Sequence, residues 1–94
     1  RHIPMDEILF FETGSRSHRI ILHGLKEQLD FTGSIQELEQ QLGKTFLRIH
    51  RAYLANRKHI QYLDAKERKV VFSNGETCLF SRKAKQILLE LNTV

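Results

Sequence analysis

The stretch Phe46-Leu47-Arg48-Ile49-His50-Arg51-Ala52-Tyr53-Leu54-Ala55-Asn56 sets two arginines and a histidine among apolar residues, and no acidic residue interrupts it. It lies inside a longer acid-free window, residues 44–59, whose basic members are Lys44, Arg48, Arg51, Arg57 and Lys58. Two more acid-free clusters occur: Arg16, Arg19 and Lys26 within residues 13–26, and Arg82, Lys83 and Lys85 near the end. One such run is usually a solvated face. Because all three fall at or near expected loops and element ends, together they favour a phosphate-binding surface.

Short apolar runs bounded by Gly, Ser and polar residues predict antiparallel strands in both halves of the chain. The expected strands cover residues 8–11, 19–23, 28–32, 46–49, 59–63, 69–72 and 76–80. Asn74-Gly75 between the last two predicts a tight hairpin turn. The fold class is therefore mostly β, and strand and helix alternate too rarely for a doubly wound parallel sheet.

Two helices are expected among these strands. Ser34 and Glu37 form a capping box, apolar residues follow at spacings of three and four, and Gly43 supplies a stop, so residues 35–42 should be helical. Apolar residues then recur at i, i+3, i+4 and i+7 from Ala84 to Leu91, behind a cap at Ser81. This second pattern predicts an amphipathic helix at the end of the chain.

Length and composition limit the class of protein. The 94 residues fit a single domain, residues 1–94, and the net charge of +4 favours an anionic partner only weakly. No apolar run approaches the roughly 20 residues of a membrane helix, so no membrane association is expected. The single cysteine, Cys78, excludes a disulfide framework and favours a reducing compartment, the cytoplasm. The first residue is Arg, and we interpret the chain as a piece of a longer protein.

Motifs for catalysis or cofactor binding are missing from the sequence. It has no glycine-rich nucleotide-binding pattern, and the spacings of its histidines match no zinc pattern. Cys78 stands in an expected strand, where a packing role is the more common one. We therefore expect no enzyme, no cofactor and no metal.

Residues 46–56 resemble the central motif of the LytTR domain family: an aromatic residue, Arg-x-His, a small or polar pair, an aromatic or aliphatic pair, and Asn. Asp6-Glu7-Ile8-Leu9-Phe10-Phe11-Glu12 resembles the opening strand of that family, and Leu79-Phe80-Ser81-Arg82-Lys83 resembles its ending. The three matches occur in the right order over nearly the whole chain. The likeness is greatest to quorum-sensing response regulators of Gram-positive bacteria, the accessory gene regulator type.

The resemblance implies an elongated β-β-β arrangement of about ten short antiparallel strands, with a short internal helix and a C-terminal helix. It implies a DNA-binding output domain of a two-component response regulator that controls transcription, with the receiver domain absent from this chain. The implied partner is double-stranded promoter DNA with tandem direct repeats. The full-length protein would be a dimer on DNA, and the free fragment would be a monomer.

The resemblance also assigns roles to residues. His18, Arg51, Lys83 and Arg82 are expected to contact bases, and either of the last two could reach guanine. Arg51 stands where close relatives place an Asn near the minor groove, and an arginine suits a narrow, electronegative groove. Phosphate contacts are expected from Arg16, Ser17, Arg19, Arg48, His50, Asn56, Ser81 and Lys85.

Several alternatives stay open at this point. Asn56 could cap a turn, His50 could hydrogen-bond the scaffold, and Tyr53 and Phe46 are better read as core residues than as stacking platforms. For the whole domain, one rival is an RNA- or single-strand-binding β-module, which would need exposed aromatic residues among the cations. The other rival is a protein-interaction domain with an acidic partner.

Overall fold

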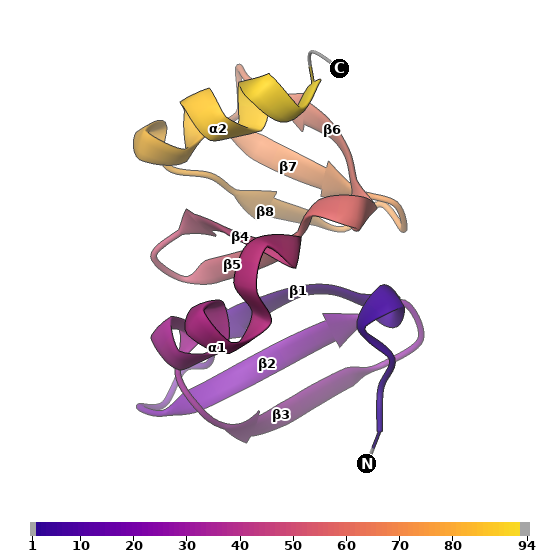
Figure 1. Cartoon of the computed structure of the whole chain (residues 1–94), viewed down its shortest axis with the longest axis vertical. Helices are drawn as coiled ribbons and strands as arrows, with labels where there is room; N and C mark the ends of the chain where they lie inside the picture. Colours follow the sequence, from indigo (N-terminus) through magenta and orange to yellow (C-terminus); the bar gives the residue numbers. More distant parts are fainter. Residues whose placement is uncertain (1, 93–94) are drawn as a thin grey trace.

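Two antiparallel sheets lie one above the other in the computed structural model, which describes residues 2–92 (Figure 1). The five-stranded sheet has the order β3-β2-β1-β5-β4, and the three-stranded sheet has the order β6-β7-β8. The molecule measures 36 × 24 × 23 Å along its principal axes, so its outline is elongated. The strands are β1 (Ile8–Thr13), β2 (Arg19–Gly24), β3 (Gln28–Thr32), β4 (Phe46–His50), β5 (Tyr53–Asn56), β6 (Ile60–Asp64), β7 (Lys69–Phe72) and β8 (Thr77–Leu79).

The mostly-β class with two helices is confirmed, and the number of strands is corrected. Residues 2–92 contain eight strands, whereas the family resemblance implied about ten. The sequence also gave no sign of β5, because Arg51 and Ala52 carry none of the Gly, Pro or Asn signals that mark most turns. His59 does not begin a strand, since it closes a short 3₁₀ turn, η3 (Arg57–His59), just before β6.

Both predicted helices are confirmed. The helix α1 (Ile35–Leu42) has the expected bounds, with Ser34 Oγ accepting from the Glu37 backbone N–H at 3.1 Å. Gly43 follows at φ 66°, a conformation that glycine adopts at little cost. The helix α2 (Arg82–Asn92) begins behind Ser81, whose Oγ accepts from the Ala84 N–H at 3.2 Å. Two further 3₁₀ turns are η1 (Met5–Glu7) and η2 (Gly43–Thr45).

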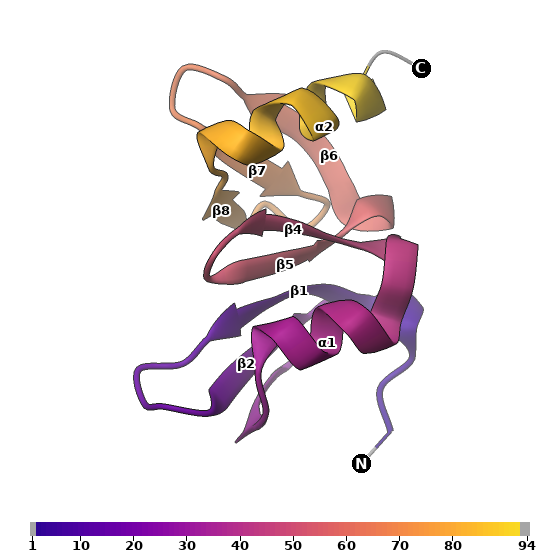
Figure 2. The same ribbon diagram turned by 60° about the vertical axis from the view of Figure 1, so that its left-hand side comes forward.

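The first four residues of β1 are buried on both faces of the five-stranded sheet, which explains why this strand reads as a continuous apolar run. Neighbouring side chains of a strand point to opposite faces. Phe11 accordingly belongs to the core cluster that contains Ile35 of α1, whereas Phe10 stacks on Phe72 and belongs to the cluster that contains Leu88 of α2. Figure 2 shows α1 lying across the larger sheet and α2 against the smaller one. Within residues 2–92, neither helix combines the length and the apolar composition that crossing a membrane requires.

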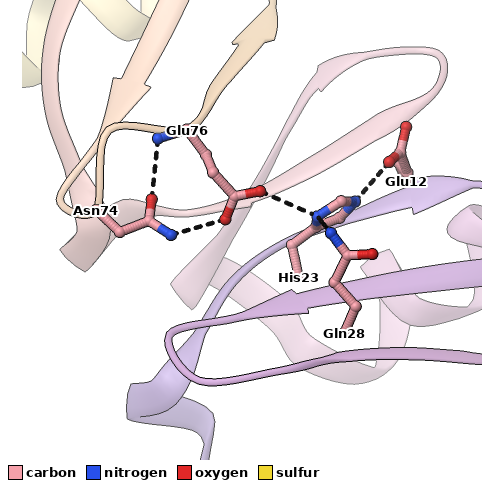
Figure 3. Close-up of polar contacts among 5 residues, drawn as sticks. All are labelled: Glu12, His23, Gln28, Asn74 and Glu76. Carbon is pink, nitrogen blue, oxygen red and sulfur yellow. Dashed lines mark hydrogen bonds and ion pairs between the residues drawn. The ribbon is translucent and has the colours of Figure 1, made fainter.

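A buried histidine joins the two sheets (Figure 3). The ring of His23, on β2, stacks on Phe10 with 4.2 Å between ring centroids. Its Nε2 contacts a carboxylate oxygen of Glu12, and its Nδ1 lies 3.2 Å from Glu76 in the β7–β8 hairpin. Glu76 is held in turn by the Asn74 side-chain amide, which donates to it at 2.7 Å. The network links strands β1, β2 and β3 of the large sheet to the hairpin of the small one, and Gln28 on β3 belongs to it through a 3.1 Å contact with His23 Nδ1.

Candidate nucleic-acid interface

Three segments that are far apart in the sequence meet at one end of the molecule. The backbone N–H of Thr13 donates to the carbonyl of Ala52 at 3.0 Å, so the β1–β2 loop lies beside the β4–β5 turn. The N–H of Ser81 donates to the carbonyl of Ile49 at 2.8 Å, which brings the start of α2 to the same turn. All three lie on the left in Figures 1 and 2. We call this surface the basic end, and its exposed polar residues include Arg16, Ser17, His18, Arg51, Arg82, Lys83 and Lys85.

The β1–β2 loop presents His18 in an unusual backbone conformation. His18 has a φ of 60°, in the left-handed region that L-residues rarely occupy. Its carbonyl accepts from the Gly33 N–H at 2.9 Å, and the Gly14 N–H donates to the carbonyl of Arg19 at 2.8 Å, so the loop is held at both ends. Within residues 2–92 the side chains of Arg16, Ser17 and His18 make no hydrogen bond or ion pair. They are available to a ligand.

The β4–β5 turn presents Arg51. Its side chain is exposed and forms no ion pair with any residue of the described chain. The ring of His50 supports the turn, because its Nδ1 accepts from the Ala52 N–H at 3.1 Å. An Nδ1 atom that accepts places the ring hydrogen on Nε2. His50 therefore supports the scaffold with one nitrogen and retains a donor on the other, so the two roles considered for it are compatible.

The start of α2 brings its cations close to Arg51. Arg51, His50, Ser81 and Lys83 line one hollow of about 380 Å³ between the turn and the helix. Arg82, Lys83 and Lys85 are exposed and have no ion-pair partner among the described residues. Ser81 is half-buried, and its hydroxyl caps the helix. Ser81 therefore stabilises the N-terminus of helix α2, which carries these cations.

Two arginines expected to contact phosphate are already engaged within the domain. Arg19 pairs with Asp30 on β3 (2.7 Å) and donates to the Thr32 hydroxyl at 2.8 Å. Arg48 donates to two backbone carbonyls and pairs with the Glu39 carboxylate at 3.1 Å. Each guanidinium lies beside a carboxylate, which offsets part of its attraction for phosphate. The sequence could not reveal Asp30 and Glu39 as partners, since neither is a neighbour in the chain.

The expectation that Asn56 contacts phosphate is corrected. Asn56 is only 1% exposed and lies at the end of β5 remote from the turn. Its amide nitrogen donates to the carbonyl of Ile8 at 2.8 Å, and its oxygen accepts from the Lys58 N–H at 3.1 Å. Asn56 thus caps η3 and ties it to the first strand, which is the alternative role that the sequence left open.

Arg68 is an exposed cation that the sequence reasoning missed. It adopts a φ of 54° in the β6–β7 turn, and its carbonyl accepts from the Phe80 N–H at 2.9 Å, one residue before Ser81. This bond places Arg68 next to the start of α2. The only sequence signal is its position in the polar stretch between the expected strands 59–63 and 69–72.

The remaining titratable side chains do not form a metal-binding cluster in the described part of the chain. Residues 2–92 contain no group of three His, Cys, Asp or Glu side chains arranged to hold a metal ion. Cys78 is buried in the core, and burial, together with the charges of Glu12 and Glu76, raises the pKa of its thiol. A thiol that stays protonated is a poor nucleophile.

Comparison with known proteins identifies the family of this chain. The family model described as the LytTr DNA-binding domain matches residues 1–92. The chain belongs to this family. Accessory gene regulator protein A is 42% identical in Staphylococcus epidermidis and 41% identical in Staphylococcus aureus, in each case over 87 residues. The alignments cover 92% of this chain but only 36% of either relative, so the chain spans about a third of their length.

A solved LytTr DNA-binding domain from Bacillus cereus has the same fold. It superposes with a TM-score of 0.80 over 98% of this chain and 86% of its own, at 22% sequence identity. The LytTr fold is thus shared at a low level of identity, and the mostly-β architecture expected from the resemblance is confirmed.

Proposed function

We propose that this LytTr domain binds double-stranded DNA sequence-specifically, as the non-enzymatic output domain of a bacterial two-component response regulator. The observation that carries the proposal is the convergence of three basic segments, through the Thr13–Ala52 and Ser81–Ile49 backbone bonds, on one end of the fold. Lysine and arginine side chains there would release counterions from DNA. We further propose a cytoplasmic role in quorum-sensing transcription control, and the name of the relatives, accessory gene regulator protein A, supports a role in gene regulation.

We infer the roles of individual residues from the exposure of each side chain and from its hydrogen-bond partners within the domain. We assign base reading to His18, Arg51, Lys83 and Arg82, which are all exposed. Lys83 lines the same hollow as Arg51, which favours it over Arg82. Phosphate contacts would come from Arg16, Ser17, Lys85 and the Nε2–H of His50. Phosphate contacts position the protein, and base contacts specify the site. Tandem direct repeats would seat two copies of a longer, receiver-bearing protein, with this single domain a monomer when free.

Binding to single strands or RNA fits the surface less well. Single-strand binders stack bases on exposed aromatic rings among the cations. Here Phe10, Phe11, Phe46, Phe72 and Phe80 are all at most 3% exposed, and the strongly exposed aromatic residue of the described chain is Tyr62 on β6. Tyr53, the aromatic residue next to the basic end, packs on His50 and Phe10.

Selection from random duplexes with the 94-residue domain tests the proposal. A recovered motif would then be titrated by fluorescence anisotropy between about 50 and 200 mM salt, where the slope of log K against log salt should be near −0.9 for each phosphate neutralised. Arg57→Gln, at the opposite end of the sheet, is the control for Arg51→Gln. Equal affinity for the selected duplex and its separated strands, or for an acidic protein at matched salt, would contradict duplex recognition.

A further inference from the structure

We propose that Arg48 determines the site preference of the domain without touching DNA, by holding the β4–β5 turn in the conformation that presents Arg51. The inference rests on the proposed DNA-binding function and concerns how its reading surface is built. Arg48 is thereby a positioning residue, and its partner Glu39 extends the control of site preference to helix α1.

The guanidinium of Arg48 binds both carbonyls of the turn. Its Nε donates to the carbonyl of His50 at 3.0 Å, and its Nη2 donates to the carbonyl of Arg51 at 2.7 Å. The guanidinium is planar and its donors have a fixed geometry, so two bonds from one group fix the relative orientation of the two peptide planes. These planes flank the Cα of Arg51, and they therefore fix the direction in which its side chain leaves the turn.

The β4–β5 turn depends on side-chain hydrogen bonds because the pairing of the two strands is irregular there. The pairing of β4 with β5 shifts register between Arg48 and His50, which is the mark of a bulge. A bulge leaves backbone groups without a ladder partner. Arg48 supplies donors to two carbonyls, and His50 Nδ1 accepts from the Ala52 N–H at 3.1 Å. Side chains thus complete the hydrogen bonding that the ladder leaves unfinished.

Glu39 completes the arrangement from the other side. Its carboxylate accepts from Arg48 Nη1 at 3.1 Å, and the Arg48 side chain is only 30% exposed. The pair links the middle of α1 to the turn and sets a negative charge beside the guanidinium. Both effects favour a fixed internal role for Arg48 over a contact with phosphate, since phosphate would have to compete with Glu39 and with two carbonyls.

The two roles predict different results in a double-mutant cycle on the selected duplex. Arg48→Gln and Arg51→Gln are made singly and together, and affinity is measured for the preferred site and for sites with each base pair changed. If Arg48 acts through Arg51, both single variants lose preference at the same base pairs, by about 10-fold. Adding Arg48→Gln to Arg51→Gln then costs less than twofold more. A phosphate contact instead predicts independent losses that multiply, a uniform effect on all sites, and a salt slope lower by about one.

Glu39→Gln provides the second test. A phosphate-contacting Arg48 predicts a change in affinity for all duplexes, whereas a positioning Arg48 predicts a change in site preference. This variant keeps the guanidinium and removes only its acidic partner. If Arg48 contacts phosphate, losing Glu39 frees it and affinity for all duplexes rises. If Arg48 positions the turn, site preference falls in the pattern of Arg48→Gln and to a smaller extent. Glu37→Gln on the same helix changes the charge equally without touching Arg48, and a glutamine there can still complete the capping box.

The outcomes separate this inference from the proposed function. A coupled cycle together with lost preference in Glu39→Gln is the expected result. The proposed role of Arg48 is overturned, with the DNA-binding function intact, if the wild-type domain is selective and the losses from Arg48→Gln and Arg51→Gln multiply. It is overturned likewise if Glu39→Gln binds all duplexes more tightly than Glu37→Gln does. A wild-type domain that prefers no duplex overturns both proposals.

Discussion

The Nδ1 atom of His23 lies 3.2 Å from a carboxylate oxygen of Glu76, and this contact joins strand β2 of the large sheet to the hairpin of the small one. The other ring nitrogen meets Glu12 within the large sheet. The Nδ1 atom also lies 3.1 Å from the side-chain amide nitrogen of Gln28 on β3, which is a donor. The geometry thus places a histidine between two carboxylates, over the stacked rings of Phe10 and Phe72.

Glu76→Gln should lower the free energy of unfolding by about 1 kcal/mol, because it removes the carboxylate that contacts the buried ring and accepts from the Asn74 amide. The estimate is kept small because the Glu76 side chain is 35% exposed and solvent screens the pair. Urea unfolding measures the change. Glu67→Gln, in the exposed β6–β7 turn, is the matched control and should change stability by less than about 0.5 kcal/mol. Equal effects of the two variants would show that the His23–Glu76 contact adds nothing.

His18→Gly and His18→Asn should separate DNA reading from backbone strain. Both remove the imidazole, so both should reduce discrimination between sites by about 10-fold. His18→Gly should also raise the free energy of unfolding by up to about 1 kcal/mol, because a φ of 60° costs energy in L-residues but not in glycine. His18→Asn should leave stability nearly unchanged, since asparagine tolerates this region.

His18→Ala is the control for this pair. It removes the same ring and keeps a Cβ in the left-handed region, so it should be the least stable of the three variants while reading DNA as poorly as the others. Thermal unfolding and binding-site profiles of all variants check the ranking. An unchanged profile in His18→Ala would remove His18 from the set of base-reading residues.

Local patterns were enough to predict α1, but not the roles of several polar residues. The helix depends on a cap at Ser34, an apolar period and a stop at Gly43, all within ten positions of the sequence. Asn56 is different, because its burial depends on the carbonyls of Met5 and Ile8, which only the folded sheet brings near it. Arg19 likewise depends on Asp30 across the β2–β3 pair. A side chain's freedom to bind a ligand depends on such tertiary partners.

Charge clusters in the sequence were divided by the fold in a similar way. Arg51 and Arg57 belong to one acid-free window, yet β5 carries the chain across the sheet between them. Arg51 consequently reaches the basic end, whereas the neighbouring Lys58 pairs with Asp6 of η1 at 3.2 Å. The separation of the two cations was not predicted because strand β5 was not predicted, and a strand between two residues places them at its opposite ends.

Lys83→Ala and Lys85→Ala should affect DNA binding in different ways. Lys83 lines the hollow that also contains Arg51, so its loss should relax preference at particular base pairs by about 10-fold. Lys85 is proposed to contact phosphate, so its loss should weaken binding uniformly and lower the salt slope by about one. Anisotropy titrations at several salt concentrations on matched and mismatched duplexes measure both effects. Arg82→Ala in the same series decides which of the adjacent cations reads the base, and an unchanged site profile in Lys83→Ala would transfer that role to Arg82.

The stability of the domain should fall as the pH rises above about 8.5, the region where an exposed thiol ionises. Burial, with the charges of Glu12 and Glu76, raises the pKa of the Cys78 thiol in the folded state, so the folded domain keeps a proton that the unfolded chain releases. The unfolded state then binds fewer protons, and unfolding becomes easier by at most about 1.4 kcal/mol per pH unit. Burial and Glu12 also raise the pKa of Tyr53, which lowers stability further above about pH 10.

Urea unfolding of wild type and Cys78→Ala between pH 7 and 9.5 isolates the thiol. The variant should be less stable at pH 7 by about 1 to 2 kcal/mol, and its free energy of unfolding should fall less as the pH rises. Parallel pH dependences in the two proteins would show that the thiol ionises alike in the folded and unfolded states.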